Sequence, residues 1–298
     1  MEAKHAFMKG RFGHGIFYRT EDFLVFITII SVLVRKMGLT VIAFCPMFNH
    51  VHFLVKDIKT QRLRLFILRA ATMFVKQYNL DYSRKGPLFK KPFGYSVKKS
   101  VKIILGSVAY VFNNPVAGKL SKKAIQYRWN LLAYIGNRTP FSKPIRKDLC
   151  RNVMRLALKK VDYFRSRNMF LTYNTLRNIF KNLDEEEHKQ IIDYILFSYN
   201  FLAFESLEEL YGNYDKLIAS IDSNAGSEFD LEDEFGDHSC YRTMLNLVKK
   251  LGYKDKKLNF EMFPDEEVDK LFSLILTTTN IPPYNINRFL HRKNEAEQ

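Results

Sequence analysis

Pro-Met-Phe-Asn-His-Val-His-Phe-Leu-Val, residues 46–55, is the stretch from which we predict the fold. His50 and His52 alternate with three apolar side chains, and this period of two indicates a half-buried β-strand. Side chains two apart share one face of a strand, so we expect the apolar side chains to enter a core and both imidazoles to project from the opposite face. Two such imidazoles are either solvated or ligands of a divalent cation, and both interpretations stay open at this point.

The segments around this strand alternate between extended and helical patterns. We expect strands near residues 5–12, 39–45, 50–56 and 94–97, and helices over 23–36, 60–80 and 100–113. The order strand, helix, strand, strand, helix, strand, helix is typical of an α+β fold, in which helices cover one face of an antiparallel sheet. We predict that this part of the chain has a ferredoxin-like core.

The net charge differs strongly between the two halves of the chain. Residues 1–150 hold 27 Lys and Arg against 6 Asp and Glu, a net charge of +21. Residues 151–298 hold 20 against 25, a net charge of −5. Neutralising phosphates releases counterions, so the basic half predicts a polyanionic partner such as nucleic acid. Ribosomal and membrane-surface proteins show the same bias, and charge alone does not separate these classes.

We predict two domains, covering residues 1–148 and 149–298. The second domain is expected to be all-α, with helices over 153–164, 173–180, 185–201, 206–221, 240–251 and 265–277. An acidic loop is expected near residues 222–238. Residues 265–293 have the rhythm of a helix-turn-helix, in which outward Asn and Arg side chains either read DNA bases or only flank a helical bundle.

Cysteine usage and hydropathy indicate the compartment. Cys45, Cys150 and Cys240 are widely spaced and odd in number, which argues against a disulfide framework and favours a reducing compartment. The best apolar run covers residues 23–34 and is shorter than the roughly 20 residues that a membrane span needs. We therefore expect a cytoplasmic protein with no membrane partner.

A second motif lies near the end of the third predicted helix. Tyr110 and Asn114 are four residues apart, so they lie on one helix face. An asparagine carbonyl can bind a hard cation, and a tyrosine phenol becomes a nucleophile when a base or a metal draws its proton away. A tyrosine near a helix end is more often a half-buried packing residue, and this alternative also stays open.

Three segments of the sequence together resemble one family. Met47–Val55 is similar to a Met-Pro-Asn-His-Val-His strand, Tyr110–Gly118 to a Tyr-Ile-x-x-Asn-Pro-Val-x-x-Gly segment, and Gly86–Phe89 to a Gly-x-Leu-Phe element. These are motifs of the single-tyrosine HUH transposases, of the REP-associated, insertion-sequence-200-like type. Gly15–Phe17, before the first predicted helix, also fits the family. The resemblance covers about residues 5–130, and the residues beyond about 150 match nothing in the family pattern.

The resemblance implies a fold, a reaction and a site. It implies a ferredoxin-like core in which His50, His52 and Asn114 hold a divalent metal, Mg²⁺ or Mn²⁺. It implies that Tyr110 attacks single-stranded or hairpin DNA and forms a 5′-phosphotyrosine. Two departures stand out: Phe48 replaces the proline of the family, and Lys90–Phe93 replaces its usual Gln-x-Arg-Phe.

Basic side chains near these motifs and in the last helix are the candidate DNA contacts. The set is Arg62, Arg69, Lys76, Arg84, Lys85, Lys90, Lys91, Lys98, Lys99, Arg288 and Arg292. Three aromatic residues interleaved with them either stack on DNA bases or belong to the core: Phe89, Phe93 and Tyr95.

Three function classes compete for this sequence. The first is a DNA nickase and strand transferase of the transposase type. The second is a non-catalytic DNA- or RNA-binding regulator on the same scaffold, which would not need His50, His52, Tyr110 and Asn114 together. The third, a basic ribosome-associated protein, accounts for the charge but not for the motifs. Whether the chain forms a homodimer stays open in all three.

Overall fold

The structure is a computed structural model, and it describes residues 1–11, 15–90, 93–146, 148–223, 243–248, 250–251, 253, 263–281 and 283–290. Contacts divide the chain into two compact units. The first comprises Met1–Phe12 and Ile16–Ser227, and the second comprises Gly13–Gly15 and Glu228–Gln298. Each unit is described by itself below.

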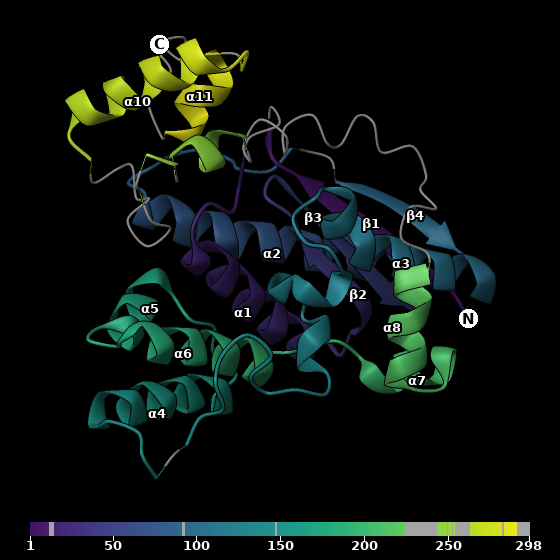
Figure 1. The fold of residues 1–298 in the computed structure, drawn as a ribbon. Helices are drawn as coiled ribbons and strands as arrows, with labels where there is room; N and C mark the ends of the chain where they lie inside the picture. The colour runs from purple at the N-terminus through teal and green to yellow at the C-terminus, as the bar shows by residue number, and fades with distance from the viewer. Residues whose placement is uncertain are drawn as a thin grey trace. The chain divides into compact units, whose positions relative to one another are not determined.

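A four-stranded antiparallel sheet forms the centre of the first unit (Figure 1). Its strands are β1 (Ala3–Lys9), β2 (Thr40–Pro46), β3 (His50–Lys56) and β4 (Gly94–Lys98), in the order β2-β3-β1-β4. The sequence predicted all four strands and the mixed α+β class, and both predictions are confirmed. The histidine strand β3 is an inner strand, paired with β1 and β2 on its two sides.

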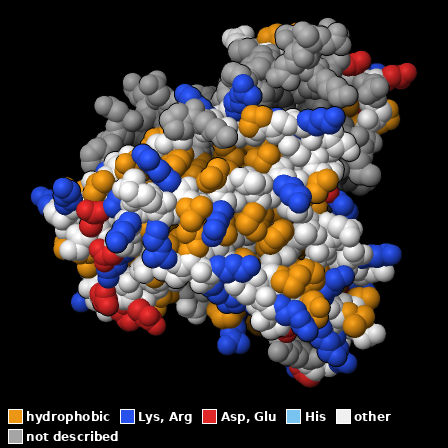
Figure 2. Space-filling view, turned by 180° about the vertical axis from the view of Figure 1, so that it is seen from behind, with side chains coloured by type: hydrophobic (Ala, Val, Ile, Leu, Met, Phe, Trp, Pro, Cys, Tyr) orange, Lys and Arg blue, Asp and Glu red, His pale blue; other side chains and the backbone are white. Residues whose placement is uncertain are grey.

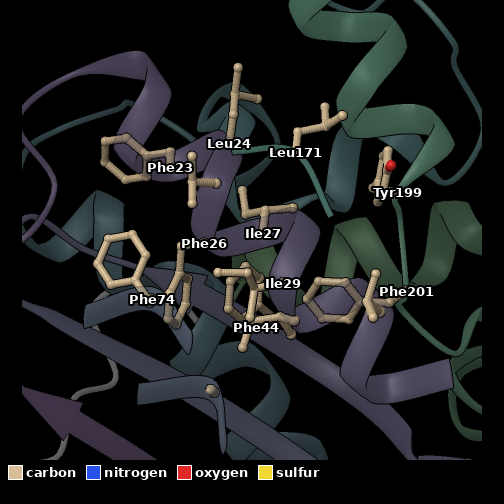
Figure 3. Close-up of a cluster of buried hydrophobic side chains, with 14 of the residues drawn as sticks. Phe23, Leu24, Phe26, Ile27, Ile29, Phe44, Phe74, Leu171, Tyr199 and Phe201 are labelled. Atoms are coloured by element: carbon tan, nitrogen blue, oxygen red, sulfur yellow. The ribbon is translucent and has the colours of Figure 1, made fainter. Parts of the chain in front are cut away.

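Two long helices, α1 (Thr20–Met37) and α2 (Thr60–Asp81), contact each other and cover one face of the sheet. The buried residues of α2 form one apolar stripe with spacings of three and four residues: Leu63, Phe66, Ile67, Ala70, Phe74 and Tyr78. Helix α1 is apolar nearly all round because it is covered on both sides. Figure 3 shows Phe26 and Ile29 of α1 beside Phe44 of the sheet, while Leu24 and Ile27 lie toward Leu171.

The third helix, α3 (Val101–Ala117), covers the other face of the sheet, where it packs against β2 and β3. The expectation that helices cover only one face was therefore wrong. Helix α3 begins as predicted, because the Ser100 hydroxyl accepts a hydrogen bond from the Ile103 amide at 3.3 Å. The helix was predicted to end at about residue 113, but it continues through Pro115 to Ala117.

The helices α4 (Asn152–Ser166), α5 (Tyr173–Phe180) and α6 (Glu185–Ser198) belong to the first unit. Helices α5 and α6 contact α1, and residues of all three helices share the core of α1 and α2. Between α4 and α5, the Leu171 amide donates a hydrogen bond to the Thr28 hydroxyl of α1 at 3.1 Å. The predicted domain boundary at 148/149 follows the change in charge, but the hydrophobic core continues across it.

The basic segment after α3 is held by a buried carboxylate of α6. It contains three short 3₁₀ turns, Ala124–Gln126, Arg128–Asn130 and Leu132–Tyr134. Asp193 accepts hydrogen bonds from the Tyr134 hydroxyl at 2.8 Å, and from the Phe141 amide and the Ser142 hydroxyl at 2.9 Å each. This network links the segment after α3 to the helices beyond residue 150 and explains why the two parts form one unit.

The predicted helix over 206–221 is two helices, α7 (Phe204–Tyr211) and α8 (Tyr214–Ser223). Gly212 separates them with a φ of 88°, a left-handed value that glycine adopts without strain. The Asn213 side chain then accepts a hydrogen bond from the Lys216 amide at 2.9 Å and starts α8. Both helices pack with α3 on the histidine face of the sheet.

The second unit contains the helices α10 (Asp265–Thr278) and α11 (Pro283–Phe289), which contact each other. Their shared core includes Val268, Leu271 and Ile286. Most of the expected acidic loop near 222–238 lies outside the described residues. Among the helices that the structure describes, none is long and apolar enough to cross a membrane.

We expect a chain that ends at residue 227 to fold, and a chain that ends at residue 148 not to fold. The shorter chain lacks Leu171, Tyr199 and Phe201, so it exposes the outer side of the buried helix α1. Thermal unfolding followed by circular dichroism checks this expectation, with the full chain as the reference. A cooperative transition in the shorter chain would restore the boundary at 148.

Candidate functional site

The two histidines of β3 are buried on the sheet face that α3 covers. His50 is 3% and His52 is 1% exposed, while Val51, Phe53 and Val55 point into the opposite core. The period of two therefore places the side chains as the sequence predicted. The interpretation of two solvated histidines is wrong, because α3 lies over this face.

Each imidazole has a polar partner at Nδ1. His50 Nδ1 lies 2.7 Å from Asn49 Oδ1, and His52 Nδ1 lies 2.9 Å from Nε2 of His5 on β1. Asn49 Oδ1 can only accept, so His50 Nδ1 carries the proton and its lone pair is on Nε2. Such partners fix the tautomer and the orientation of a histidine that binds a metal.

Tyr110 of α3 lies over this histidine cluster. Its half-buried ring is 5.7 Å from the ring of His52 and 5.6 Å from the ring of His5, measured between centroids, and it meets both nearly edge-on. The rings of His50 and His52 are 4.8 Å apart. The structure thus brings together the two motifs that are about 60 residues apart in the sequence.

Asn114 is a buried residue of α3, 1% exposed, and only one half of its amide is hydrogen-bonded. Its Nδ2 donates to the Tyr110 carbonyl at 2.9 Å. Its Oδ1 is buried and, among the described residues, has no hydrogen-bond partner, and the same holds for Nε2 of His52. A buried acceptor without a donor is costly, and a divalent cation satisfies both an amide oxygen and an imidazole nitrogen. The donor set therefore fits a cation.

The environment of His5 and of His52 favours the neutral imidazole. Burial, followed by the charge of Lys98, lowers the pKa of His5 to about 4. Burial lowers the pKa of His52 well below its usual value, and the charges of its neighbours lower it further. Neutral imidazole is the form that binds a metal, so these shifts suit a ligand.

Comparisons with known proteins give no independent support for a role of these residues. No family model, no curated protein and no solved structure matches this chain. Within the described residues, no three or more His, Cys, Asp or Glu side chains are grouped so that they could hold a metal.

The candidate DNA contacts on α2 lie on the other face of the sheet from the histidine cluster. Arg62, Arg69 and Lys76 are exposed on α2, which packs on the opposite face of the sheet from the histidines. Arg62 donates to the Met37 carbonyl, so it also fastens α2 to the end of α1. These three residues stay candidate DNA contacts, but they lie on the face of the sheet away from Tyr110.

The loop before β4 carries several of the basic residues predicted to contact DNA, and the structure describes some of them. Arg84 donates to Asn79 Oδ1 at 3.2 Å, and Lys85 and Lys90 are exposed. The Lys90 amide bonds to the Lys9 carbonyl at 2.8 Å, which fixes the loop to the end of β1. Lys91 and Arg292 lie outside the described residues, as does the side chain of Arg288 in α11.

Strand β4 and its neighbours carry the basic residues on the histidine face. Lys98 is half-buried and pairs in register with Ala3, whose side chain lies in the core of α3, and Lys99 is exposed. Of the aromatic residues, Phe89 belongs to the core, Phe93 is half-buried and Tyr95 is 38% exposed. Of these three, Tyr95 is the most exposed and is the candidate for stacking on a base.

Two residues of the cluster, His5 and Lys9, were not among the predicted site residues. In the register of β1 with β3, Phe7 lies opposite His52 and Lys9 lies opposite His50. The signal was the alternation in His5–Lys9, whose polar and aromatic members share one strand face. The alternation alone could not show which strand lies beside β1.

Proposed function

We propose that this protein is a metal-dependent DNA nickase and strand transferase of the single-tyrosine HUH transposase type. The observation that carries the proposal is the position of the Tyr110 ring, 5.7 Å from His52 in a buried cluster that also holds His50. A regulator that only binds nucleic acid does not need a phenol beside a pair of buried imidazoles. The motif resemblance supports the same function.

The fold of residues 1–98 agrees with this proposal. The order of elements is β1, α1, β2, β3, α2, β4, and the strands lie in the order β2-β3-β1-β4. We propose that this part is a ferredoxin-like domain, with α3 as an added helix that carries the nucleophile. We infer a cytoplasmic protein, where DNA is accessible to it.

In the proposed reaction, the scissile phosphate of DNA is transferred from a 3′ oxygen to the Tyr110 oxygen. The Tyr110 oxygen attacks the scissile phosphorus and loses its proton to water, the bond to the 3′ oxygen breaks, and that oxygen takes up a proton. Nε2 of His50, Nε2 of His52 and Oδ1 of Asn114 would hold Mg²⁺ or Mn²⁺. The bound ion supplies Lewis acidity and orients the phosphate. The bond to Tyr110 conserves the phosphodiester, so rejoining to another 3′ hydroxyl needs no nucleotide cofactor.

The charge of the chain supports a DNA substrate. Residues 1–227 hold 37 Lys and Arg against 17 Asp and Glu, a net charge of +20. Figure 2 shows Lys and Arg side chains spread over the reverse face of the molecule, interspersed with hydrophobic side chains. Lys9 and Lys98 share the sheet face of the histidines, where they can meet the phosphates on either side of the scissile bond.

We expect DNA binding to weaken with salt. Single-stranded DNA that makes about five phosphate contacts should bind roughly 100-fold more weakly at about 200 mM than at about 50 mM salt, because each contact releases bound counterions. Fluorescence anisotropy of a labelled single-stranded oligonucleotide measures this change. Lys98→Gln should reduce the salt slope, whereas Lys160→Gln on α4 should not. Equal affinity at both salt concentrations contradicts the assignment of a DNA partner.

The proposal is tested by covalent trapping. Full-length protein is incubated with labelled single-stranded and hairpin oligonucleotides and Mn²⁺ or Mg²⁺, and the products are separated on a denaturing gel. We expect a protein–DNA band that survives denaturation and that is lost when the metal is chelated. Absence of the band with every metal and every DNA would favour the non-catalytic regulator.

A further inference from the structure

His5 is a buried side chain that the reaction above does not use directly. It is 9% exposed on β1, and its Nε2 lies 2.9 Å from Nδ1 of His52. The two rings are stacked, with centroids 5.1 Å apart and planes 23° apart. The contact joins two neighbouring strands, so the backbone pairing of β1 with β3 fixes it.

We propose that His5 is a positioning residue for the cation site: it accepts the Nδ1 proton of His52 and thereby turns the Nε2 lone pair of His52 toward the cation. This inference rests on the proposed function and deepens it. A histidine ligand with its other ring nitrogen bonded to a fixed acceptor keeps one tautomer and one ring orientation. The hydrogen bond to Asn49 gives His50 the same tautomer, so both Nε2 atoms carry lone pairs.

The geometry excludes the alternative in which His5 binds the same cation through Nε2. That nitrogen is at hydrogen-bond distance from His52 Nδ1, and the two atoms share one proton between them. If His5 donated instead, His52 would carry its proton on Nε2. That nitrogen is buried and, within the described part of the chain, has no acceptor, so this tautomer is disfavoured.

Variants at position 5 separate the hydrogen bond from packing. His5→Phe keeps a ring of similar size and removes the acceptor, whereas His5→Gln places an amide oxygen where Nε2 lies. We expect His5→Phe to weaken Mn²⁺ binding by the full chain about 10–100-fold, as loss of such partners does at other metal sites. His5→Gln should restore most of the affinity. Electron paramagnetic resonance of free Mn²⁺ measures both, and circular dichroism checks folding.

The tautomer of His52 is a readout that does not depend on metal or activity. In the full chain labelled with ¹⁵N-histidine, long-range ¹H–¹⁵N spectra should show His52 protonated at Nδ1 and bare at Nε2. A His52 that carries its proton on Nε2 overturns the inference, and this measurement needs only the wild-type protein.

The two proposals can fail separately. If Mn²⁺ binding is the same in the wild type and in His50→Ala, the proposed cation site fails, whatever the state of His5. If Mn²⁺ binding depends on His50 but His5→Phe binds as tightly as the wild type, the site stands and the role of His5 is refuted. Equal weakening in His5→Phe and His5→Gln also refutes it, since packing alone would then account for the loss.

Discussion

Tyr110→Phe should abolish DNA cleavage and leave both folding and DNA binding in place. The substitution removes one oxygen from a half-buried ring and keeps the edge-on contacts with His5 and His52. We expect the free energy of unfolding to change by less than about 1 kcal/mol. Without the phenol oxygen no covalent intermediate forms, so the loss should reach the detection limit of the assay.

The matched control for this substitution is Tyr163→Phe on α4. Tyr163 is 49% exposed, and its ring contacts the Arg167 guanidinium rather than the histidine cluster. This variant should cleave DNA as the wild type does. Adduct formation by Tyr110→Phe would mean that another residue is the nucleophile, and a large loss of DNA binding would mean that Tyr110 acts in recognition.

His50→Ala should also abolish cleavage, through loss of the cation. His50 is buried and its Nδ1 is bonded to Asn49, so the substitution removes one ligand and leaves Tyr110 in place. A metal centre that polarises the phosphate contributes several kcal/mol to transition-state stabilisation, which corresponds to a loss of at least about 10³-fold in rate. Single-turnover cleavage with Mn²⁺ and Mg²⁺ measures it.

A remote histidine serves as the control for the loss of His50. His188 of α6 lies against Phe180 with ring centroids 4.3 Å apart, and His188→Ala should cleave DNA normally. His50→Ala should still bind the hairpin, because the basic side chains are unchanged. Cleavage by His50→Ala at the wild-type rate, or wild-type cleavage in the presence of a chelator, would contradict a metal-assisted reaction.

The elements that the sequence predicted well are those with strong hydrophobic periodicity. Strand β3 and the buried stripe of α2 follow directly from spacings of two and of three to four residues. The same spacing placed His50 and His52 on one face and Tyr110 and Asn114 on another. That the two faces meet depends on α3 crossing the sheet, which periodicity does not reveal.

The features that the sequence did not predict depend on contacts between distant segments. The boundary at 148 followed charge, but Leu171 and Tyr199 complete the core around α1. His5 joins the cluster only because β1 pairs with β3 in one register, and a shift of one residue would turn it to the other face. Sequence patterns show which face a side chain occupies, whereas the partner of that face is set by topology.

Mapping the covalent bond is the most direct test of the central claim, that Tyr110 is a nucleophile on DNA. Full-length protein is incubated with Mn²⁺ and a pool of randomised hairpin and single-stranded oligonucleotides, then digested with nuclease and trypsin and analysed by mass spectrometry. Trypsin releases residues 103–119, a peptide in which Tyr110 is the only tyrosine. We predict a nucleotide on Tyr110 of this peptide. An unmodified peptide in every sample, or a nucleotide on another residue, would contradict the account.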